Sequence, residues 1–263
     1  MNVLSLQETV GGRELRGTAF LPDESAYPVP TAVLQHGFGS NRMEAAGLFV
    51  QLSRALNAAG FATVAFDRAG HGESDGEFFD TTVSRDVRDA VELLDRIPDM
   101  TFVDASQVHL VGMSMGSVVS SVVAAQRSDR VRSLTLWSPA AVFVDDARSG
   151  SMQGRSVTAE LERGWFDNGG VRLGPAFFEE ARAFDVYGRA KGFHGPVLVM
   201  SGDADVVVPV RYAEAYAEVY GDAARITIVP GADHIWSSVP LREVLIPETV
   251  EFMTTVSAAA RSW

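Results

Sequence analysis

Residues 108–119 have the sequence VHLVGMSMGSVV, an apolar run followed by Gly-x-Ser-x-Gly and then by small and β-branched residues. This order is typical of a strand, a sharp turn and the start of a helix, which together form a nucleophile elbow. Glycines at positions 112 and 116 let strand and helix approach closely, while the serine between them adopts unfavourable backbone angles. The stretch predicts that Ser114 is exposed at the carboxyl end of a strand. The motif alone also fits an ordinary turn, so its surroundings decide between the two.

The composition bounds the class of protein. The chain has 263 residues, of which 46% are hydrophobic and 21% charged, as in a soluble globular protein with a large core. Its net charge of −12 makes nucleic acid and anionic membrane surfaces unfavourable partners. There is no cysteine, which excludes disulfides, a thiol nucleophile and a thiolate metal site.

The start of the chain and its apolar runs carry no targeting pattern. The first 16 residues contain Glu and Arg and lack the basic-then-apolar order of a secretory signal. No apolar run approaches the roughly 18 residues that a membrane span needs. We therefore expect a cytoplasmic protein without a membrane span.

Strands and helices alternate along most of the chain, which predicts an α/β fold. Apolar runs predict a hairpin in residues 2–21 and strands at 31–35, 61–66, 107–112, 131–137, 196–200 and 224–229; helical spacing predicts helices at 44–59, 81–97, 115–127, 209–220 and 241–260. Such alternation implies right-handed crossovers and a mostly parallel sheet with helices on both faces. Ligands bind at the loops that follow the carboxyl ends of such strands.

The alternation stops in residues 141–187, which we predict to form a small lid, with residues 1–140 and 188–263 as the core. A linker would not carry the aromatic residues found there, Trp165, Phe166, Phe177 and Phe178. Its many glycines favour a mobile cover over a self-contained core. Because the segment follows the strand at 131–137, beside the serine turn, we expect it to lie over Ser114. We therefore predict that Trp165, with Phe166, contacts substrate.

A serine nucleophile needs a base, and five histidines compete for this role. His109 lies inside a predicted strand, His71 in a glycine-rich turn and His194 at the amino end of a strand. His36 ends a strand near the serine, but the glycines that follow it indicate a backbone role for its loop. His234 follows the last predicted strand at its carboxyl end and is the preferred base.

The base in turn needs a carboxylate that orients it. The loop after the strand at 196–200 offers Asp203 and Asp205, and either could reach a histidine in the next loop. Asp233 more readily caps its own turn. The pair at 145–146 is a rival location, which we interpret as a solvated charge pair at the start of the lid. The order serine, aspartate, histidine along the chain is expected for this elbow and favours Asp205.

An oxyanion hole needs two backbone N–H groups aimed at the developing negative charge. Met115, directly after the serine, supplies one of them. The other should come from the loop at 36–39, His-Gly-Phe-Gly, which brings the amide of Phe38 close to the serine. Four separate motifs then fall at the ends of the predicted strands in the expected order.

Together these motifs resemble those of the α/β-hydrolases, and more narrowly those of the cinnamoyl and feruloyl esterases related to monoacylglycerol lipases. The resemblance covers nearly the whole chain from about residue 14. It rests on His-Gly-Phe at 36–38, Asp-x-x-Gly-His-Gly-x-Ser-Asp-Gly at 67–76, the elbow at 112–116, Leu-x-Ser-Pro-Ala-Ala at 136–141, Gly-Asp-x-Asp-x-x-Val-Pro at 202–209 and Pro-Gly-x-x-His at 230–234.

The resemblance implies an α/β-hydrolase fold with an eight-stranded, mostly parallel sheet and a short insertion over an acyl or aryl pocket. It implies Ser114 as nucleophile, Asp205 as acid and His234 as base, with an oxyanion hole formed by the amides of Phe38 and Met115.

The elbow differs at three positions from that of the family that the sequence resembles. His, Gln and Gly are usual where Met113, Met115 and Ser117 stand in this chain. A methionine beside the nucleophile makes the wall of the site softer and more apolar, which affects the substrate rather than the chemistry. We add Gly37 and Met113 to the residues that are expected to bind substrate.

The expected function is that of a serine carboxylic-ester hydrolase acting through an acyl-enzyme on apolar aryl or short- to medium-chain acyl esters. Alternatives with the same triad are carbon–carbon bond hydrolysis, thioester hydrolysis, acyl transfer and perhydrolysis. A non-catalytic ligand-binding protein is a further alternative, against which an intact triad argues. We expect a small-molecule ester as partner, with no cofactor and no metal. The oligomeric state stays open, a homodimer included.

Overall fold

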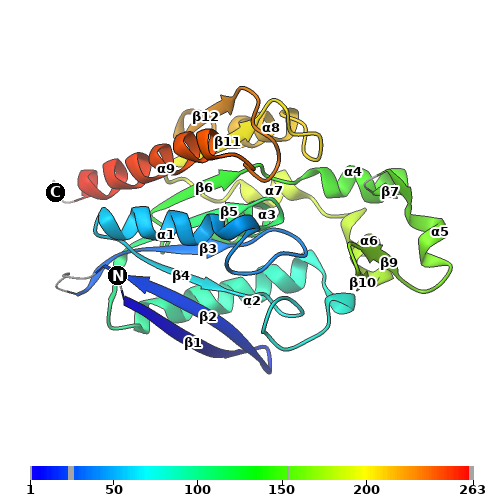
Figure 1. Cartoon of the computed structure of the whole chain (residues 1–263), viewed down its shortest axis with the longest axis horizontal. Helices are drawn as coiled ribbons and strands as arrows, with labels where there is room; N and C mark the ends of the chain where they lie inside the picture. The colour runs from blue at the N-terminus through cyan, green and yellow to red at the C-terminus, as the bar shows by residue number, and fades with distance from the viewer. Residues whose placement is uncertain (1, 23–26, 153, 261–263) are drawn as a thin grey trace.

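The computed structural model describes residues 2–22, 27–152 and 154–260. Its centre is an eight-stranded sheet in the order β1-β2-β4-β3-β5-β6-β11-β12 (Figure 1). The strands are β1 (Asn2–Val10), β2 (Arg13–Leu21), β3 (Val29–Gln35), β4 (Ala62–Phe66), β5 (Val103–Met113), β6 (Ser133–Trp137), β11 (Val197–Gly202) and β12 (Ala224–Val229). The pairings of β1 with β2 and of β2 with β4 are antiparallel, and the other neighbours are parallel. The predicted mostly parallel, eight-stranded sheet is confirmed.

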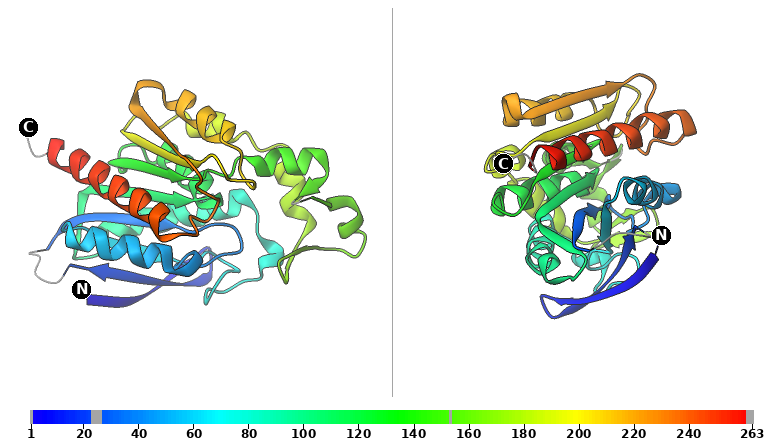
Figure 2. Two further views of the ribbon diagram at one scale, coloured as in Figure 1. Left: turned by 45° about the horizontal axis from the view of Figure 1, so that its top comes forward. Right: turned by 90° about the vertical axis from the view of Figure 1, so that its left-hand side faces the viewer.

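Helices cover both faces of the sheet, because each parallel strand returns through a crossover. One face is covered by α2 (Val83–Arg96), α3 (Met115–Gln126) and α8 (Arg211–Tyr220), the other by α1 (Leu48–Ala58) and α9 (Val239–Ala260) (Figure 2). The repeat of Leu48, Leu52 and Leu56 that predicted α1 is fully buried against the sheet. None of the helices in the described part of the chain combines the length and the hydropathy that a bilayer crossing requires.

Residues 141–187, here called the insertion, leave the sheet after β6 and lead back towards β11. The insertion contains α4 (Val142–Ser149), α5 (Val157–Leu161), α6 (Pro175–Ala181), the first residues of α7 (Val186–Ala190), and two small antiparallel sheets made by β7 (Ser151–Met152) with β8 (Arg155–Ser156) and by β9 (Phe166–Asn168) with β10 (Val171–Leu173). It extends beyond the carboxyl ends of the parallel strands (Figure 1). The insertion therefore lies at the edge of the sheet to which the predicted site residues belong.

The interior of the insertion is aromatic and well buried, although its glycines were expected to make it a poor self-contained core. The buried rings that contact one another belong to Phe143, Phe166, Phe177, Phe178 and Phe184. This cluster is continuous with the core on the α3 face of the sheet. The glycines at 150, 154, 164, 169 and 170 all have positive φ. They occupy turns whose positive φ is unfavourable for other residues. They therefore end the short helices and strands without disturbing the packing of the aromatic rings.

His109 lies inside β5, as predicted, and is buried between the sheet and α9. Its Nδ1 lies 2.7 Å from the hydroxyl of Ser133, and its Nε2 lies 3.0 Å from the hydroxyl of Ser257. Burial, and secondarily the charge of Arg132, lower the pKa of His109 to about 3. The imidazole is therefore neutral in the folded protein at any pH near neutrality.

We expect His109 to make folding sensitive to acid. In the unfolded chain a histidine takes up a proton near pH 6.5, whereas the pKa of folded His109 is about 3. The free energy of unfolding therefore falls as the pH drops below 6.5, by up to about 1.4 kcal/mol per pH unit from this residue. His109→Gln should make the pH dependence shallower by that slope. Urea titrations of both proteins between pH 6.5 and 4.5 measure it, and equal slopes would contradict the expectation.

Candidate active site

Ser114 stands in the sharp turn between β5 and α3. Its backbone has φ 55° and ψ −118°, a combination that residues other than glycine rarely adopt. The elbow motif predicts such an unfavourable conformation. The turn is anchored to the neighbouring strand β6, because the Ser114 amide donates to the carbonyl of Trp137 (2.8 Å). The hydroxyl of Ser117, at a position where the family that the sequence resembles usually has glycine, shares its single hydrogen between the carbonyls of Gly112 (2.7 Å) and Trp137 (3.0 Å). These bonds keep the strained conformation in place.

The two glycines of the elbow are required by space. A Cβ atom on Gly112 would lie 2.4 Å from the carbonyl oxygen of Gly116. A Cβ atom on Gly116 would lie 1.9 Å from the carbonyl oxygen of Gln35, at the end of β3. Both distances are far below van der Waals contact, so only glycine allows α3 to lie this close to β5 and β3.

The side chains of Ser114, His234 and Asp205 form one row of hydrogen bonds. Nε2 of His234, in the loop after β12, lies 3.0 Å from Oγ of Ser114. Nδ1 of the same ring lies 2.8 Å from Oδ2 of Asp205, in the loop after β11. The other oxygen of Asp205 accepts hydrogen bonds from the amides of Val207 (2.9 Å) and Val208 (2.7 Å). The carboxylate is thus fixed from one side and holds the imidazole from the other, with Nε2 directed at the serine hydroxyl.

The competing carboxylates of this region bind their own loops. Oδ1 of Asp203 accepts the amide hydrogen of Gly231 at 2.6 Å. Oδ1 of Asp233 accepts the amide hydrogen of Ser237 at 2.8 Å, the turn-capping role predicted for it. Each of these side chains thus stabilises a loop at the carboxyl edge of the sheet by accepting a backbone hydrogen bond.

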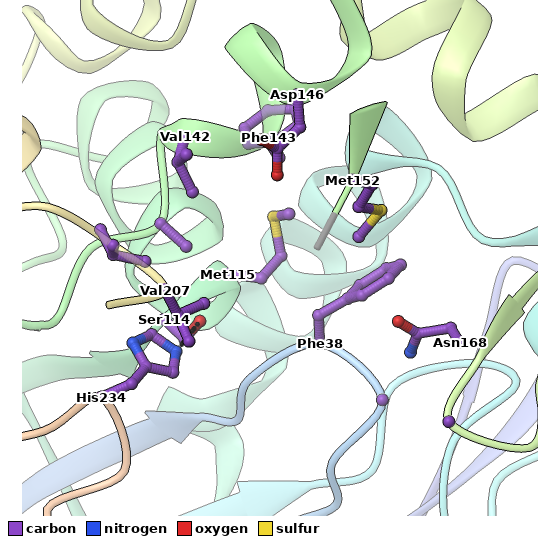
Figure 3. A pocket seen from close by; sticks show the side chains of 14 residues that line it. Phe38, Ser114, Met115, Val142, Phe143, Asp146, Met152, Asn168, Val207 and His234 are labelled. Carbon is purple, nitrogen blue, oxygen red and sulfur yellow. Dashed lines mark hydrogen bonds between the residues drawn. The ribbon is translucent and has the colours of Figure 1, made fainter. Parts of the chain in front are cut away.

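Phe38 and Met115, whose backbone amides we predicted to form the oxyanion hole, both lie near Ser114. Both residues border the cavity in front of Ser114 (Figure 3). Met115 is the first residue of α3, and the first amides of a helix have no acceptor within it. Among the described residues, no protein acceptor is found for either amide. The two N–H groups are therefore available to an anionic oxygen.

A cavity of about 420 Å³ opens beside Ser114 and His234, between the sheet and the insertion. Apolar and polar groups contribute to its wall in similar measure, and the apolar residues are Phe38, Met115, Ala140, Val142, Phe143, Met152, Val207 and Val208. Two polar side chains, Asp146 of α4 and Asn168 of β9, also line it and lie on the side away from Ser114 (Figure 3). The cavity thus has a reactive end at Ser114 and His234, apolar side chains along its wall, and two polar side chains at separate places away from the reactive end (Figure 3).

Asp145 is exposed to solvent, as the sequence predicted, whereas Asp146 is half-buried and lines the cavity. Oδ2 of Asp145 accepts the hydroxyl hydrogen of Tyr212 at 2.6 Å. Asp146 instead points into the cavity, and its carboxylate has no hydrogen-bond partner within the described residues. Burial, and then the charge of Asp145, raise the pKa of Asp146 above its ordinary value. A ligand with a hydrogen-bond donor would satisfy this carboxyl group.

The two aromatic residues that we predicted to contact substrate do not line the cavity. Phe166 is buried inside the insertion, where its ring packs edge to face on Phe178 with the centroids 5.5 Å apart. Trp165 is half-buried between two cations, with the guanidinium of Arg163 4.1 Å and that of Arg172 5.2 Å from its ring centroid. Both residues belong to the segment that borders the cavity, but their side chains are not part of its lining.

Gly37 and Met113 also lie outside the cavity wall. A Cβ atom on Gly37 would lie 3.5 Å from Cβ of Ser114, so this residue stands behind the nucleophile. Met113 ends β5 and is buried in the cluster on the face covered by α1 and α9. Strand alternation places it on that face, while Ser114 turns away towards the cavity.

Sequence reasoning missed the side chains of α4 and β9 that line the cavity. Asp146 follows Val142 by four residues and Phe143 by three, so the helical spacing of α4 could have placed it on the same face as each of them. Asn168 carries no such signal. Its place depends on the pairing of β9 with β10, two strands of three residues each.

Comparison with known proteins identifies the family. The family model of the serine aminopeptidases, S33, matches residues 28–160, about half of the chain. The chain is a hydrolase of this family. Est1E from Butyrivibrio proteoclasticus, solved with ferulic acid bound, is similar to this hydrolase with 26% identity and a TM-score of 0.87, over 96% of this chain and 99% of Est1E. The predicted α/β-hydrolase with a feruloyl esterase-like fold is confirmed.

Two further proteins are similar to this hydrolase. The uncharacterized protein Rv2307c of Mycobacterium tuberculosis is 28% identical over 227 residues, which cover 86% of this chain and 70% of that protein. A monoacylglycerol lipase from Paleococcus ferrophilus has the same fold, with 21% identity and a TM-score of 0.69 over 92% of this chain and 99% of the lipase.

Proposed function

We propose that this hydrolase is a serine carboxylesterase that works through an acyl-enzyme at Ser114. The observation that carries the proposal is the row of hydrogen bonds from Asp205 through His234 to Ser114, at the reactive end of a cavity with several apolar side chains in its wall. Two amides without protein acceptors, those of Phe38 and Met115, border the same end.

In the proposed mechanism Oγ of Ser114 attacks the ester carbonyl carbon, and Nε2 of His234 takes the hydroxyl proton. Asp205 keeps the other ring proton on Nδ1 and stabilises the imidazolium that forms. The carbonyl oxygen becomes an oxyanion, which accepts hydrogen bonds from the amides of Phe38 and Met115. The alcohol leaves with the proton from His234. A water then attacks the acyl-enzyme by the same route and releases the acid.

We propose an apolar aryl or short- to medium-chain acyl ester as substrate. The wall formed by Phe38, Val142, Phe143 and Met152 supports an apolar acyl group, and about 420 Å³ suits one of modest size. The unpartnered carboxyl of Asp146 favours an acyl group whose far end carries a hydrogen-bond donor, such as a phenolic hydroxyl. Ferulic acid, the molecule bound to Est1E, has such a group.

We further propose that the insertion, residues 141–187, acts as the lid of this site on a core formed by residues 1–140 and 188–263. Its support is the place of the insertion, because α4, β7 and β9 all contribute to the cavity wall. The aromatic interior favours a lid that moves as one packed unit rather than as a flexible loop.

A pair of esters tests the substrate proposal. Methyl 4-hydroxycinnamate and methyl cinnamate differ only in the donor that Asp146 would meet. Asp146→Asn should lower kcat/KM for the hydroxylated ester about 10-fold, since a hydrogen bond to a charged group contributes about 1.5–3 kcal/mol. The plain ester should change less than about threefold. Asp145→Asn is the matched control and should leave the ratio of the two esters unchanged. Equal losses on both esters from Asp146→Asn would contradict the proposed far end.

The reaction class is tested with the wild-type enzyme on a wider panel. A thioester and a 1,3-diketone of similar acyl size are assayed beside these methyl esters. The proposal predicts the highest kcat/KM for an oxygen ester. A diketone or thioester turned over faster than every ester would move the function to carbon–carbon bond or thioester hydrolysis.

A further inference from the structure

The turn after β3 carries Phe38, and the amides on either side of Phe38 both have acceptors inside the protein. The amide of Gly37 donates to Oε1 of Glu44. The amide of Gly39 donates to Nε2 of His71 at 3.4 Å. In the part of the chain that the structure describes, the amide of Phe38 has no such acceptor. Occupying its neighbours leaves the Phe38 amide as the available donor of this turn.

The buried carboxylate of Glu44 accepts three hydrogen bonds. Besides the amide of Gly37, it accepts the hydroxyl hydrogen of Ser40 and the amide hydrogen of Ala45, both at 3.0 Å and both on Oε2. Its own backbone has φ 58°, a left-handed conformation that is unfavourable for a glutamate. The surrounding contacts therefore hold Glu44 in a strained conformation from which its carboxylate reaches the turn.

Arg68 holds the same turn by its carbonyl groups. Its Nη1 donates to the carbonyl of His36 and its Nη2 to the carbonyl of Gly37, both at 2.8 Å. The guanidinium is buried and pairs with Asp86, Nε to Oδ2, at 3.2 Å. The ring of His36 also forms hydrogen bonds that fix this turn. Its Nε2 accepts the amide of Arg68 (3.0 Å), so its Nδ1 carries the proton and donates to the carbonyl of Gly37 (2.8 Å).

These hydrogen bonds fix two consecutive peptide groups. The first is held at both its oxygen and its nitrogen, and the second is held at its oxygen. The carbonyl of His36 and the amide of Gly37 belong to one planar peptide, which is held by Arg68 on the oxygen and by Glu44 on the nitrogen. The carbonyl of Gly37 and the amide of Phe38 belong to the next peptide, and they point in opposite directions. Holding this carbonyl inside the protein therefore aims the amide of Phe38 outward.

We propose that Glu44 and Arg68 are positioning residues for the oxyanion donor of Phe38, a role that rests on the proposed function. Neither side chain lines the cavity, so neither touches the substrate. Their effect is on the direction of one N–H group. That group interacts with the oxyanion of the transition state more strongly than with the carbonyl of the bound ester. Losing the position should therefore lower kcat while substrate binding stays nearly unchanged.

The test compares Glu44→Gly and Glu44→Gln with the wild-type enzyme on p-nitrophenyl acetate. Glycine removes the carboxylate and accepts the left-handed backbone without strain, so the fold should be kept. Its kcat should fall about 10- to 100-fold with KM within about threefold, because removing an oxyanion donor outright lowers kcat about 10²- to 10³-fold. The binding of phenylboronic acid, which forms a tetrahedral adduct with the serine, should weaken by a similar factor. Glu44→Gln keeps an oxygen acceptor for the Gly37 amide and should retain most of kcat.

The matched control is Asn57→Ala, at the far end of α1. Asn57 is buried and donates to the carbonyls of Phe20 (3.1 Å) and Phe61 (2.8 Å), so its loss should lower Tm without lowering kcat. If Glu44→Gly fails to fold, Arg68→Lys decides by the same criteria. Lysine keeps the positive charge beside Asp86 but lacks the fork that binds two carbonyls at once.

The proposal is overturned if the folded variant keeps more than a third of wild-type kcat, or if its loss lies in KM alone. Loss of kcat with unchanged affinity for phenylboronic acid would also overturn it. Ser114→Ala in the same assay separates this failure from that of the proposed function. An active Ser114→Ala means that the proposed function is wrong. An inactive Ser114→Ala beside a fully active Glu44→Gly means that only the positioning role is wrong.

Discussion

Ser114→Ala is expected to lower kcat for ester hydrolysis by a factor on the order of 10⁶, because it removes the atom that carries the acyl group. His234→Ala should lower kcat about as much, and the double variant little further, since nucleophile and base act as one unit. The 3.0 Å contact between Oγ and Nε2 is the physical basis of that unit. The remaining rate would come from the cavity and from the amides of Phe38 and Met115.

The measurement is steady-state hydrolysis of p-nitrophenyl acetate by purified variants whose circular dichroism matches the wild type. Alanine is smaller than either side chain, and both side chains border the cavity, so folding should be unaffected. Ser114→Ala with a tenth or more of wild-type turnover would contradict the assignment of the nucleophile.

Asp205→Asn is the second large effect, a loss in kcat of about 10⁴-fold. Its Oδ1 would still accept the amides of Val207 and Val208, so the amide nitrogen of asparagine would take the place of Oδ2 beside Nδ1 of His234. That nitrogen donates where a carboxylate accepts, and it therefore favours the ring tautomer with the proton on Nε2. A protonated Nε2 cannot take the proton of the serine.

Asp203→Asn is the matched control, two residues away in the same loop. Asp203 accepts the amide of Gly231 through one oxygen, and asparagine keeps such an oxygen. We expect kcat within about threefold of the wild type, since the amide oxygen of asparagine still accepts this hydrogen bond and Asp203 makes no hydrogen bond with His234 or Ser114. Equal losses from the two substitutions, or a larger loss from Asp203→Asn, would reverse the assignment of the acid.

The sheet and the row of site residues were predictable because each depends on local sequence next to a strand end. Gly112 and Gly116 mark the elbow through a steric requirement that the structure shows directly, with a Cβ on Gly116 only 1.9 Å from a carbonyl oxygen. Asp205 and His234 follow buried strands that pair in a regular parallel sheet. The carboxyl ends of parallel strands lie at one edge, so these residues meet whatever the details of the helices.

The insertion was less predictable because, apart from α4, its elements are too short to show a period. Strand β9 has three residues, and its buried Phe166 and cavity-lining Asn168 lie on the same side, two residues apart. Whether that side faces the cavity or the interior changes along the strand with the twist and packing of the insertion. The role of Glu44 depends on a backbone with φ 58° and ψ 173°, a region in which glycine is usual, and no sequence pattern predicts this conformation at a glutamate.

The most direct test of the central claim is the identification of the residue that becomes acylated. Wild-type enzyme is mixed with p-nitrophenyl acetate and quenched in acid during turnover, and a second sample is labelled with a fluorophosphonate. Peptide mass spectrometry of both samples then locates the added mass. We predict a single acetylated and phosphonylated site at Ser114, and no adduct in Ser114→Ala. An adduct on another residue, or none while the enzyme turns over the ester, would contradict an acyl-enzyme at Ser114.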